Sequence, residues 1–439
     1  MIRPDEMELP EGFQRRIQGQ LGEETSAFLL AMSRPPVRGI RFHPDRREKE
    51  RKEDDLEGQI PWSPMSFFLR TDSERGRTAA HEAGAFYLQE PSAMIAAQVM
   101  EAQPGEMILD LCAAPGGKST QLGIAMKGKG LLISNEPVAK RTQVLSRNIE
   151  RMGIPNAIVT CAWPEQLALR WPEGFDGVLA DVPCSGEGMF RRDPETRKEW
   201  TEEKSRGCAV RQAAILESAA RLVRPGGRLV YATCTWNPDE NERQMERFLL
   251  EHPQFEPEGF QLPGVQAPHG SFTCWLHHFQ GEGQFIMKLR RKGSGEAFLP
   301  LSSAGKGLSG ENARIWHRNF PFLPEPNGFR GTLAYRLPIV PDLNGLRVYR
   351  TGLHLAEIRE KNILPDHAAA LNTGFAEGPV TEISGEAALR YLAGEEIEGS
   401  VSGWTALRWN GLILGWGKGS GGKIKNHYPK GLRNNRLML

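Results

Sequence analysis

The sequence predicts an α/β fold, a Rossmann-like doubly wound sheet with smaller regions before and after it. Strand-like apolar runs alternate with helical patterns from about residue 93 to 290. Polar or small residues follow the ends of these runs, as they do at the carboxyl edge of parallel sheets. A stretch rich in Gly and Ser, residues 292–310, then marks a boundary.

The composition is that of a globular protein of two to four domains. The chain has 439 residues and a net charge of +1, so nucleic-acid binding would need local basic patches. Its six cysteines form no Cys-x-x-Cys pair, which argues against a zinc site and suits a reducing cytoplasm. No apolar run is long enough to span a bilayer. We therefore expect a cytoplasmic protein with no metal and no membrane partner.

Residues 1–92 form a first region ahead of the sheet. A helical pattern runs through Leu30, residues 37–42 alternate like a strand, and residues 67–70 suggest another strand. The charged run 43–57 is interpreted as a solvated loop. Arginines alternate with aromatic residues here and suggest weakly that the region contacts RNA. These arginines are Arg15, Arg16, Arg38, Arg41 and Arg70.

The stretch 107–121 is the centre of the predicted site. Met107–Leu111 has the apolar character of a buried parallel strand, and Ser92 can cap the helix that leads into it. Small residues from Ala113 to Gly117 let a ligand approach the backbone and the N–H groups of the next helix. A phosphate loop would need glycine where Cys112 stands, and the dinucleotide fingerprint needs a third glycine. A nucleotide-type ligand is still expected.

A second apolar run, residues 131–136, ends in Glu136. An acid at the tip of the second strand can accept hydrogen bonds from ribose hydroxyls. The alternative is a Glu that faces solvent. A helix with four basic residues and a third strand, residues 157–160, follow it.

Two cysteines follow the ends of later strands. The run 177–181 ends in Asp181, three residues before Cys184, and the run from Arg228 leads to Cys234. A helix over 211–222 lies between them. A single cysteine is more often a small buried residue than a nucleophile. Two cysteines at one sheet edge, beside a nucleotide-type loop, favour a chemical role.

A thiol beside a bound methyl donor can activate a pyrimidine so that the donor methylates it. A thiolate that adds to carbon 6 makes carbon 5 nucleophilic, so carbon 5 can accept a methyl group. The thiol must be partly ionised, and an acid near ring nitrogen 3 would stabilise the adduct. A base must then remove the carbon 5 proton before the thiol leaves. The residues alone do not rank Cys184 and Cys234.

The end of the chain is basic. Residues 416–436 hold six Lys or Arg and no acid, a pattern that suits a phosphate backbone. Asn410-Gly411, between two apolar runs, predicts a hairpin. We therefore favour a small folded β module over a disordered basic end.

Four motifs occur in order: Gln89-Glu-Pro-Ser92, Asp110-Leu-Cys-Ala-Ala-Pro-Gly-Gly-Lys118, Asp181-Val-Pro-Cys-Ser-Gly-Glu-Gly188 and Thr233-Cys-Thr235. With them the chain resembles the RNA cytosine-5 methyltransferases of the NOL1/NOP2/Sun family. The flanking regions resemble the bacterial RsmF-like branch that acts on 16S rRNA. The resemblance implies five segments. They are an N-terminal RNA-binding region (1–92), a methyltransferase domain (93–291), a linker (292–310), an intermediate module (311–382) and a PUA-like RNA-binding module (383–439).

The resemblance also implies the site residues. Cys234 would be the nucleophile, Cys184 would assist product release, and Asp181 would contact the cytosine and close the donor pocket. S-adenosylmethionine, which leaves as S-adenosylhomocysteine, would be held by Glu136 at its ribose and by one loop. That loop is Cys112, Ala113, Ala114, Pro115, Gly116, Gly117 and Lys118. Trp163 stands near where relatives often meet the adenine with an acid or amide, so adenine recognition stays open.

The resemblance implies a monomer that acts on 16S rRNA or the small ribosomal subunit. Three alternatives remain. The first is a tRNA substrate. The second is an ATPase built on Gly116-Gly-Lys-Ser119. The third is an RNA-binding assembly factor without catalysis.

Overall fold

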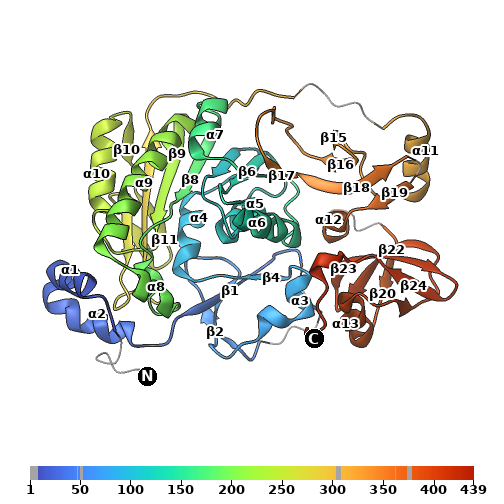
Figure 1. Cartoon of the computed structure of the whole chain (residues 1–439), viewed down its shortest axis with the longest axis horizontal. Coiled ribbons are helices and arrows are strands. Elements are labelled where there is room, and N and C mark those ends of the chain that lie inside the picture. Colours follow the sequence, from blue (N-terminus) through green and yellow to red (C-terminus); the bar gives the residue numbers. More distant parts are fainter. Residues whose placement is uncertain (1–7, 47, 50–52, 303–307, 361, 373–377) are drawn as a thin grey trace.

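The computed structural model describes residues 8–439 apart from 47, 50–52, 303–307, 361 and 373–377. A mixed sheet with the strand order β10-β14-β9-β8-β5-β6-β7-β17 forms its centre, and β10 (Phe255–Pro257) is at one edge (Figure 1). Its parallel strands are β5 (Met107–Asp110), β6 (Leu131–Asn135), β7 (Ala157–Thr160), β8 (Phe175–Asp181) and β9 (Val223–Thr233). β14 (Gln284–Arg291) runs antiparallel to β9. The doubly wound sheet is thus confirmed.

Helices cover both faces of this sheet. α4 (Ile95–Val99), α5 (Gly117–Ala125) and α6 (Ala139–Arg151) share one apolar core with it. α7 (Pro164–Arg170), α9 (Glu202–Leu222) and α10 (Glu242–Glu251) share the other core. The helix predicted over 211–222 is the second half of α9, which begins earlier because Thr201 caps it by accepting the N–H of Lys204 at 3.1 Å.

The prediction that Ser92 caps the next helix is wrong. Ser92 lies inside a short 3₁₀ turn, η4 (Ser92–Met94), and its hydroxyl donates to Glu90 Oε2 at 2.5 Å. The Glu90 carboxylate instead accepts the backbone N–H groups of Ser92 and Ala93, both at 2.8 Å. A longer acidic side chain reaches the free N–H groups from just before the turn.

The N-terminal region has two parts that pack on different partners. α1 (Glu11–Leu21) and α2 (Thr25–Met32) form an apolar core with residues of the central domain, among them Phe190 and Trp236. A four-stranded sheet in the order β2-β3-β1-β4 follows. Its strands are β1 (Arg38–Phe42), β2 (Leu56–Gln59), β3 (Ser66–Leu69) and β4 (Phe86–Leu88). β2 begins inside the charged run that was predicted to be a loop; residues 47 and 50–52 of that run lie outside the described residues.

The intermediate module is tied into the central sheet. β15 (Gly328–Arg330), β16 (Leu333–Arg336), β18 (Leu353–Arg359) and β19 (Asn362–Pro365) form a sheet of their own. β17 (Val348–Thr351), however, pairs antiparallel with β7, with Val348 opposite Thr160. The edge of the central sheet is therefore supplied from beyond the linker (Figure 1).

The C-terminal module is folded. Its sheet has the order β20-β22-β23-β24-β21 beside α13 (Gly385–Ala393). The strands are β20 (Val380–Glu382), β21 (Ile397–Glu398), β22 (Gly403–Trp409), β23 (Leu412–Ser420) and β24 (Lys423–Asn426). The predicted hairpin is confirmed, because Asn410 and Gly411 join β22 to β23 with φ angles of 48° and 82°.

The N-terminal sheet and the C-terminal module are in contact. The N-terminal sheet and the C-terminal module share one core, in which Phe86 and Tyr391 are buried. Thr78 also bridges to Met438. Figure 1 shows the C-terminus beside the N-terminal sheet.

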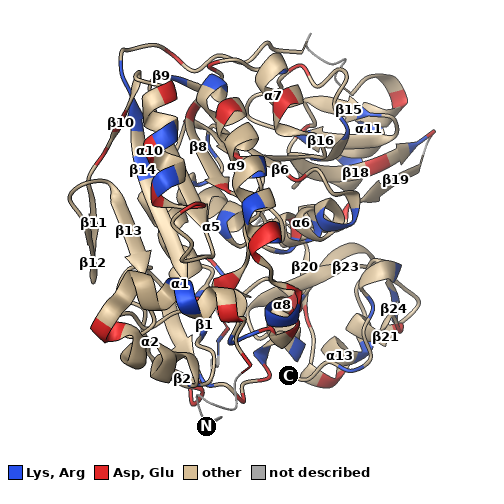
Figure 2. Cartoon of the chain, turned by 60° about the vertical axis from the view of Figure 1, so that its left-hand side comes forward, with Lys and Arg blue, Asp and Glu red and all other residues tan. Residues whose placement is uncertain are grey.

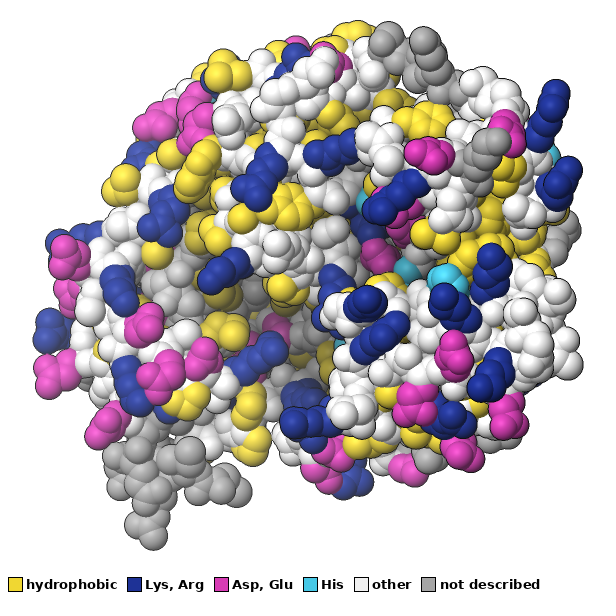
Figure 3. All heavy atoms as spheres, turned by 45° about the vertical axis from the view of Figure 1, so that its right-hand side comes forward, with side chains coloured by type: hydrophobic (Ala, Val, Ile, Leu, Met, Phe, Trp, Pro, Cys, Tyr) yellow, Lys and Arg dark blue, Asp and Glu magenta, His cyan; other side chains and the backbone are white. Residues whose placement is uncertain are grey.

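Charge is spread over the surface in both signs. Figure 2 shows basic and acidic residues side by side on α9 and α10. Figure 3 shows Lys and Arg among Asp and Glu on another face, without a large area of one sign. Among the described residues, no helix is long and apolar enough to cross a membrane.

Candidate active site

Most of the predicted site residues meet at one cavity of about 730 Å³. It lies at the carboxyl edge of the parallel strands and has the size usual for a small-ligand site. The predicted residues that line it are Cys112, Ala113, Ala114, Pro115, Gly117, Lys118, Asp181, Cys184 and Cys234. Gly116 and Glu136 are not among the lining residues.

The loop between β5 and α5 supplies one wall. Gly116 has a φ of 113°, which a residue with a side chain rarely adopts, and it immediately precedes α5. Arg41 supports this loop from behind, since its Nη2 donates to Gly117 O at 3.1 Å and to Thr120 Oγ1 at 2.8 Å. Arg41 is 4% exposed, so its suggested role as an RNA contact is wrong.

Lys118 and Asp181 connect the loop to the next strand end. Lys118 Nζ lies 2.6 Å from Asp181 Oδ2. Burial opposes the charge on Lys118, but the Asp181 carboxylate outweighs burial and raises the Lys118 pKa. Negative charge on Cys234 raises it further. The ammonium is therefore fixed where it can stabilise a thiolate at Cys234.

Asp110 was in the quoted motif but was not predicted to be a site residue. It lines the cavity from the end of β5, and its Oδ2 accepts the Ser119 hydroxyl at 2.6 Å. Oδ1 is buried with no partner among the described residues, and burial raises the Asp110 pKa to about 7. A positively charged ligand in the cavity would compensate this carboxylate, so the residues fit a cationic sulfonium donor.

Glu136 lies at the end of β6, as predicted, but is tied to its own loop. Its side chain is 1% exposed, and its Oε1 accepts the Val138 N–H at 3.0 Å. Arg141, which was not predicted, lies 3.1 Å from Glu136 Oε2 and donates to Ala114 O at 3.1 Å. Burial raises the Glu136 pKa. The ribose contact of Glu136 stays a prediction, whereas Arg141 lines the cavity.

The two thiols are adjacent. Cys184 follows β8 and Cys234 follows β9, which lies beside it, and the two Sγ atoms are 3.0 Å apart. The backbone N–H of Cys234 donates to Cys184 Sγ at 3.2 Å. The hydrogen bond to Cys234, together with burial, raises the Cys184 pKa well above its usual range. Cys184 therefore holds its proton in the resting site.

Two buried acids that were not predicted hold the loops that carry the thiols. Glu240 accepts the Ser185 N–H at 2.9 Å, and also the Ser205 hydroxyl and the Gln212 amide, both at 2.8 Å. Glu187 accepts the Trp236 N–H at 3.2 Å. Glu187 stands in the quoted Asp181–Gly188 motif and Glu240 six residues after Cys234, but only their 0% exposure distinguishes them from surface acids.

Trp163 is apart from the cavity. Its side chain is 61% exposed and it does not line the site. Other lining residues were not predicted as site residues, among them Tyr87, Met189, Arg192 and Gln284. Arg192 and Met189 belong to the segment that follows Cys184, so they come to the site with that thiol.

The residues of the ATPase alternative are engaged elsewhere. A phosphate loop needs its lysine and hydroxyl free for phosphates and Mg²⁺. Here Lys118 pairs with Asp181, and Ser119 donates to Asp110. The geometry therefore disfavours this alternative.

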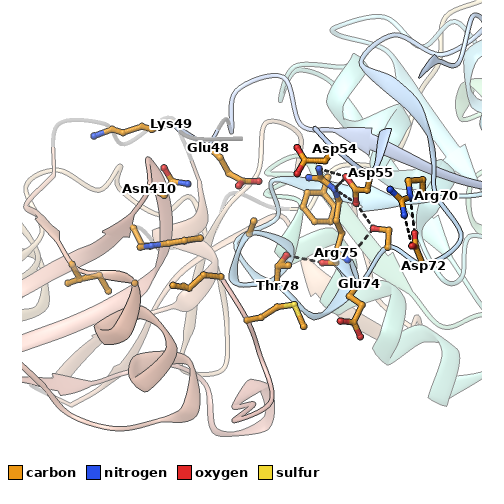
Figure 4. A pocket seen from close by; sticks show the side chains of 18 residues that line it. Glu48, Lys49, Asp54, Asp55, Arg70, Asp72, Glu74, Arg75, Thr78 and Asn410 are labelled. Atoms are coloured by element: carbon orange, nitrogen blue, oxygen red, sulfur yellow. Dashed lines mark hydrogen bonds and ion pairs between the residues drawn. The ribbon is translucent and has the colours of Figure 1, made fainter. Parts of the chain in front are cut away.

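A second cavity, of about 880 Å³, lies between the N-terminal sheet and the C-terminal module (Figure 4). Two ion pairs form within it: Arg75 lies 2.6 Å from Asp55 and Arg70 lies 2.6 Å from Asp72. No thiol lines it. It separates two domains and shows none of the chemistry of the first cavity.

One further cluster joins the N-terminal helices to the central domain. Glu24 Oε2 lies 2.8 Å from His277 Nε2 and 2.7 Å from His278 Nε2. Among the described residues it is the one group with the spacing of metal ligands. The carboxylate already hydrogen-bonds the Nε2 atom of both imidazoles.

Four family models match in sequence order. Residues 97–290 match the model of the 16S rRNA methyltransferases RsmB/F, and residues 9–91 match the N-terminal domain of RsmF. Residues 320–372 match the first C-terminal domain of RsmF, and residues 379–434 match its PUA domain.

Proteins from several bacteria are similar over nearly the whole chain. "Ribosomal RNA small subunit methyltransferase F" of Aliivibrio fischeri is 31% identical, with 98% of each chain covered. The protein of that name from Cronobacter sakazakii is 31% identical over 85% of this chain and 84% of its own.

Solved structures share the fold. A methyltransferase homologue from Pyrococcus horikoshii has a TM-score of 0.56 at 25% identity, covering 65% of this chain and 96% of its own. NSun6 from the same organism, solved with SFG, has a TM-score of 0.57 at 20% identity, covering 66% of this chain and all of its own.

Proposed function

Since the chain belongs to the RsmB/F family of 16S rRNA methyltransferases, in its RsmF branch, we propose that it methylates carbon 5 of a cytosine in 16S rRNA. S-adenosylmethionine is the proposed donor. The observation that carries the proposal is the pair of thiols 3.0 Å apart in the cavity that the 112–118 loop also lines. Methyl transfer to an oxygen or an exocyclic nitrogen needs no such pair.

The donor side of the cavity would bind and orient S-adenosylmethionine. The small residues 112–117 leave room beside the backbone, and Asp110 offers a compensating negative charge. When bound, S-adenosylmethionine supplies an electrophilic methyl group. Asp181 stands between this side and the thiols, fixed by Lys118 at 2.6 Å.

The thiol side activates the base. The Cys234 thiolate, its proton lost to solvent, would add to carbon 6, and the electron pair displaced toward carbon 5 would form the new carbon–methyl bond as the methyl–sulfur bond of the donor breaks and S-adenosylhomocysteine leaves. Lys118 lines the same cavity as Cys234, so in this proposal its ammonium stabilises the thiolate before attack. Asp181 lines the same cavity, and in this proposal it forms the hydrogen bond to the cytosine ring as charge develops there.

Release requires a base. Loss of the carbon 5 proton restores the double bond, and the Cys234–carbon 6 bond breaks. Cys184 would act in this step as a thiolate, after its own proton has passed to solvent, and its raised pKa makes that thiolate a strong acceptor for the carbon 5 proton. The target cytosine must also be turned out of its stack to enter the cavity, and unstacking costs a free energy of roughly a few kcal/mol.

The test is bisulfite sequencing of ribosomal and transfer RNA from cells with and without the protein. We expect one cytosine of 16S rRNA to lose protection when the protein is absent. Loss of protection only in tRNA would move the substrate to that class. Unchanged protection in both, with RNA binding retained, would identify an assembly factor without catalysis.

Purified components complete the test. The protein with S-adenosylmethionine labelled in its methyl group should transfer label to 16S rRNA, offered naked or in the small subunit. Label on a base other than 5-methylcytosine would overturn the proposed chemistry.

A further inference from the structure

We propose that Arg16, on the N-terminal helix α1, is a positioning residue that holds the two thiol loops in register. The thiol loops are residues 182–188, which carry Cys184, and residues 234–241, which carry Cys234. This inference rests on the proposed function. It makes the N-terminal helices part of the catalytic scaffold and not only an RNA-binding extension.

A single guanidinium touches both loops. Arg16 Nη2 forms an ion pair with the carboxylate of Glu187, three residues after Cys184. Arg16 Nη1 donates to the carbonyl of Trp236, two residues after Cys234, at 3.1 Å. Only the planar fork of arginine offers two donors at this spacing. The side chain is 20% exposed, so it is committed to the interior.

A neighbour on the same helix repeats the contact. Gln20 Nε2 donates to the Trp236 carbonyl at 3.0 Å, and Gln20 Oε1 accepts from Arg16 Nη1 at 2.9 Å. Two residues one turn apart on α1, Arg16 and Gln20, therefore hydrogen-bond the same carbonyl of the loop that carries Cys234.

Glu187 connects the two loops, because it belongs to the loop with Cys184 and its side chain hydrogen-bonds the loop with Cys234. It is fully buried, and its Oε1 accepts Trp200 Nε1 at 3.1 Å while its Oε2 accepts the Trp236 N–H at 3.2 Å. Burial raises the pKa of Glu187, and the Arg16 guanidinium opposes that rise. Without Arg16 the carboxylate would keep its neutral donors but would be a buried charge without a cationic partner, which favours uptake of a proton or a shift of the side chain.

The loops are linked directly as well. The Gly188 N–H donates to the Cys234 carbonyl at 2.9 Å, and the hydroxyls of Ser185 and Thr235 lie 2.9 Å apart. A shift of Glu187 is therefore transmitted to both sulfurs within a few bonds.

Aromatic packing fixes α1 and α2 against the same loops. The rings of Phe28 and Trp236 meet edge to face with centroids 5.0 Å apart. Phe13 packs on Phe190 at 5.1 Å, just beyond the first loop. The helices, the loops and the ion pair thus form one buried unit.

The test measures adduct formation on RNA that carries 5-fluorocytidine. Fluorine at carbon 5 cannot leave as a proton does, so the Cys234 adduct accumulates after methyl transfer. The rate is measured in a single turnover at saturating RNA and S-adenosylmethionine. Arg16→Met should lower it by about 10- to 100-fold, the range expected when reacting groups shift by an ångström. The dissociation constants for RNA and S-adenosylhomocysteine should change little.

Matched variants separate positioning from general damage. Arg16→Lys keeps the charge but loses the fork, so its rate should lie between those of Arg16→Met and the unchanged protein. Gln18→Met, an exposed change on the same helix, should leave the rate unchanged. Equal rates for Arg16→Met and the unchanged protein would overturn the inference.

A double-mutant cycle tests the route through Glu187. Glu187→Gln alone should slow adduct formation, and the double variant with Arg16→Met should be no slower than the worse single variant. Losses that multiply would mean that Arg16 acts independently of Glu187 and would overturn the inference. No adduct from the unchanged protein would instead refute the proposed function.

Discussion

The donor side and the thiol side of the catalytic cavity are built in opposite ways. The donor side is built mainly on one continuous stretch, β5, its loop and α5, in which the contact of Ser119 with Asp110 spans nine residues. Arg41 and Arg141 support it from outside that stretch. The thiol side joins residues 50 apart and depends on α1, more than 160 residues before either thiol loop. The donor loop is thus formed by neighbouring residues, whereas the two sulfurs are brought together by contacts between distant parts of the chain.

Four substitutions probe this difference, beginning with the thiol side. Cys234→Ala removes the atom that activates the pyrimidine, so methyl transfer should fall by at least about a thousandfold, because the covalent route is lost. Binding of S-adenosylhomocysteine, measured by calorimetry, should remain because the 112–118 loop is unchanged. Appreciable turnover by this variant would remove Cys234 from its role.

Cys184→Ala should block release and not attack. Multiple turnover should fall by about a hundredfold, the scale of general-base catalysis. A protein–RNA adduct should accumulate as a slow band on a denaturing gel. If Cys234→Ala formed that band instead, the two roles would be exchanged.

Lys118→Met tests the connection between the two sides. It leaves Asp181 without the partner at 2.6 Å, so the single-turnover rate should fall by about tenfold or more. Lys129→Met, at an exposed lysine beyond the same helix, is the matched control. Similar rates for both variants would show that the Lys118–Asp181 pair is dispensable.

Asp110→Asn tests the donor side through pH. The Asp110 pKa is about 7 in the folded chain and 3.8 when exposed, so the folded state retains a proton that the unfolded state releases. The free energy of unfolding should therefore fall as pH rises from about 4 to 7, by roughly 2–4 kcal/mol for this group alone. Asp110→Asn does not lose this unfolding free energy as pH rises. Its melting temperature should therefore be higher than that of the unchanged protein at pH 8 and similar to it at pH 4.

Asp72→Asn, at an exposed carboxylate paired with Arg70, should not reproduce this stabilisation at pH 8. A melting difference between Asp110→Asn and the unchanged protein that stays constant from pH 4 to 8 would contradict the assigned protonation of Asp110.

The same difference explains how far the sequence was informative. The strands 107–111, 131–136 and 157–160 and the turn at Gly116 were predicted because apolar periodicity and small residues are local signals. The sequence also placed both thiols at one edge, because parallel strands end together.

What sequence reasoning missed depends on burial. Arg16 and Arg41 resemble RNA-binding arginines in the sequence, yet Arg16 pairs with the buried Glu187 and Arg41 hydrogen-bonds the Gly117 carbonyl. Glu187 and Glu240 resemble surface acids until the fold encloses them. No periodicity predicts that β17 pairs with β7, because that contact joins residues nearly 190 apart across a linker.

The position of β17 bears on how the enzyme is made. Until residues 348–351 have been synthesised, the outer backbone groups of β7 have no partner strand, so the newly made domain would present an open edge prone to aggregation. A chain cut after residue 291 would keep every sulfur and every loop of the cavity and would still present that edge. The methyltransferase domain therefore completes its sheet only after translation has passed the last residue of the cavity and reached β17.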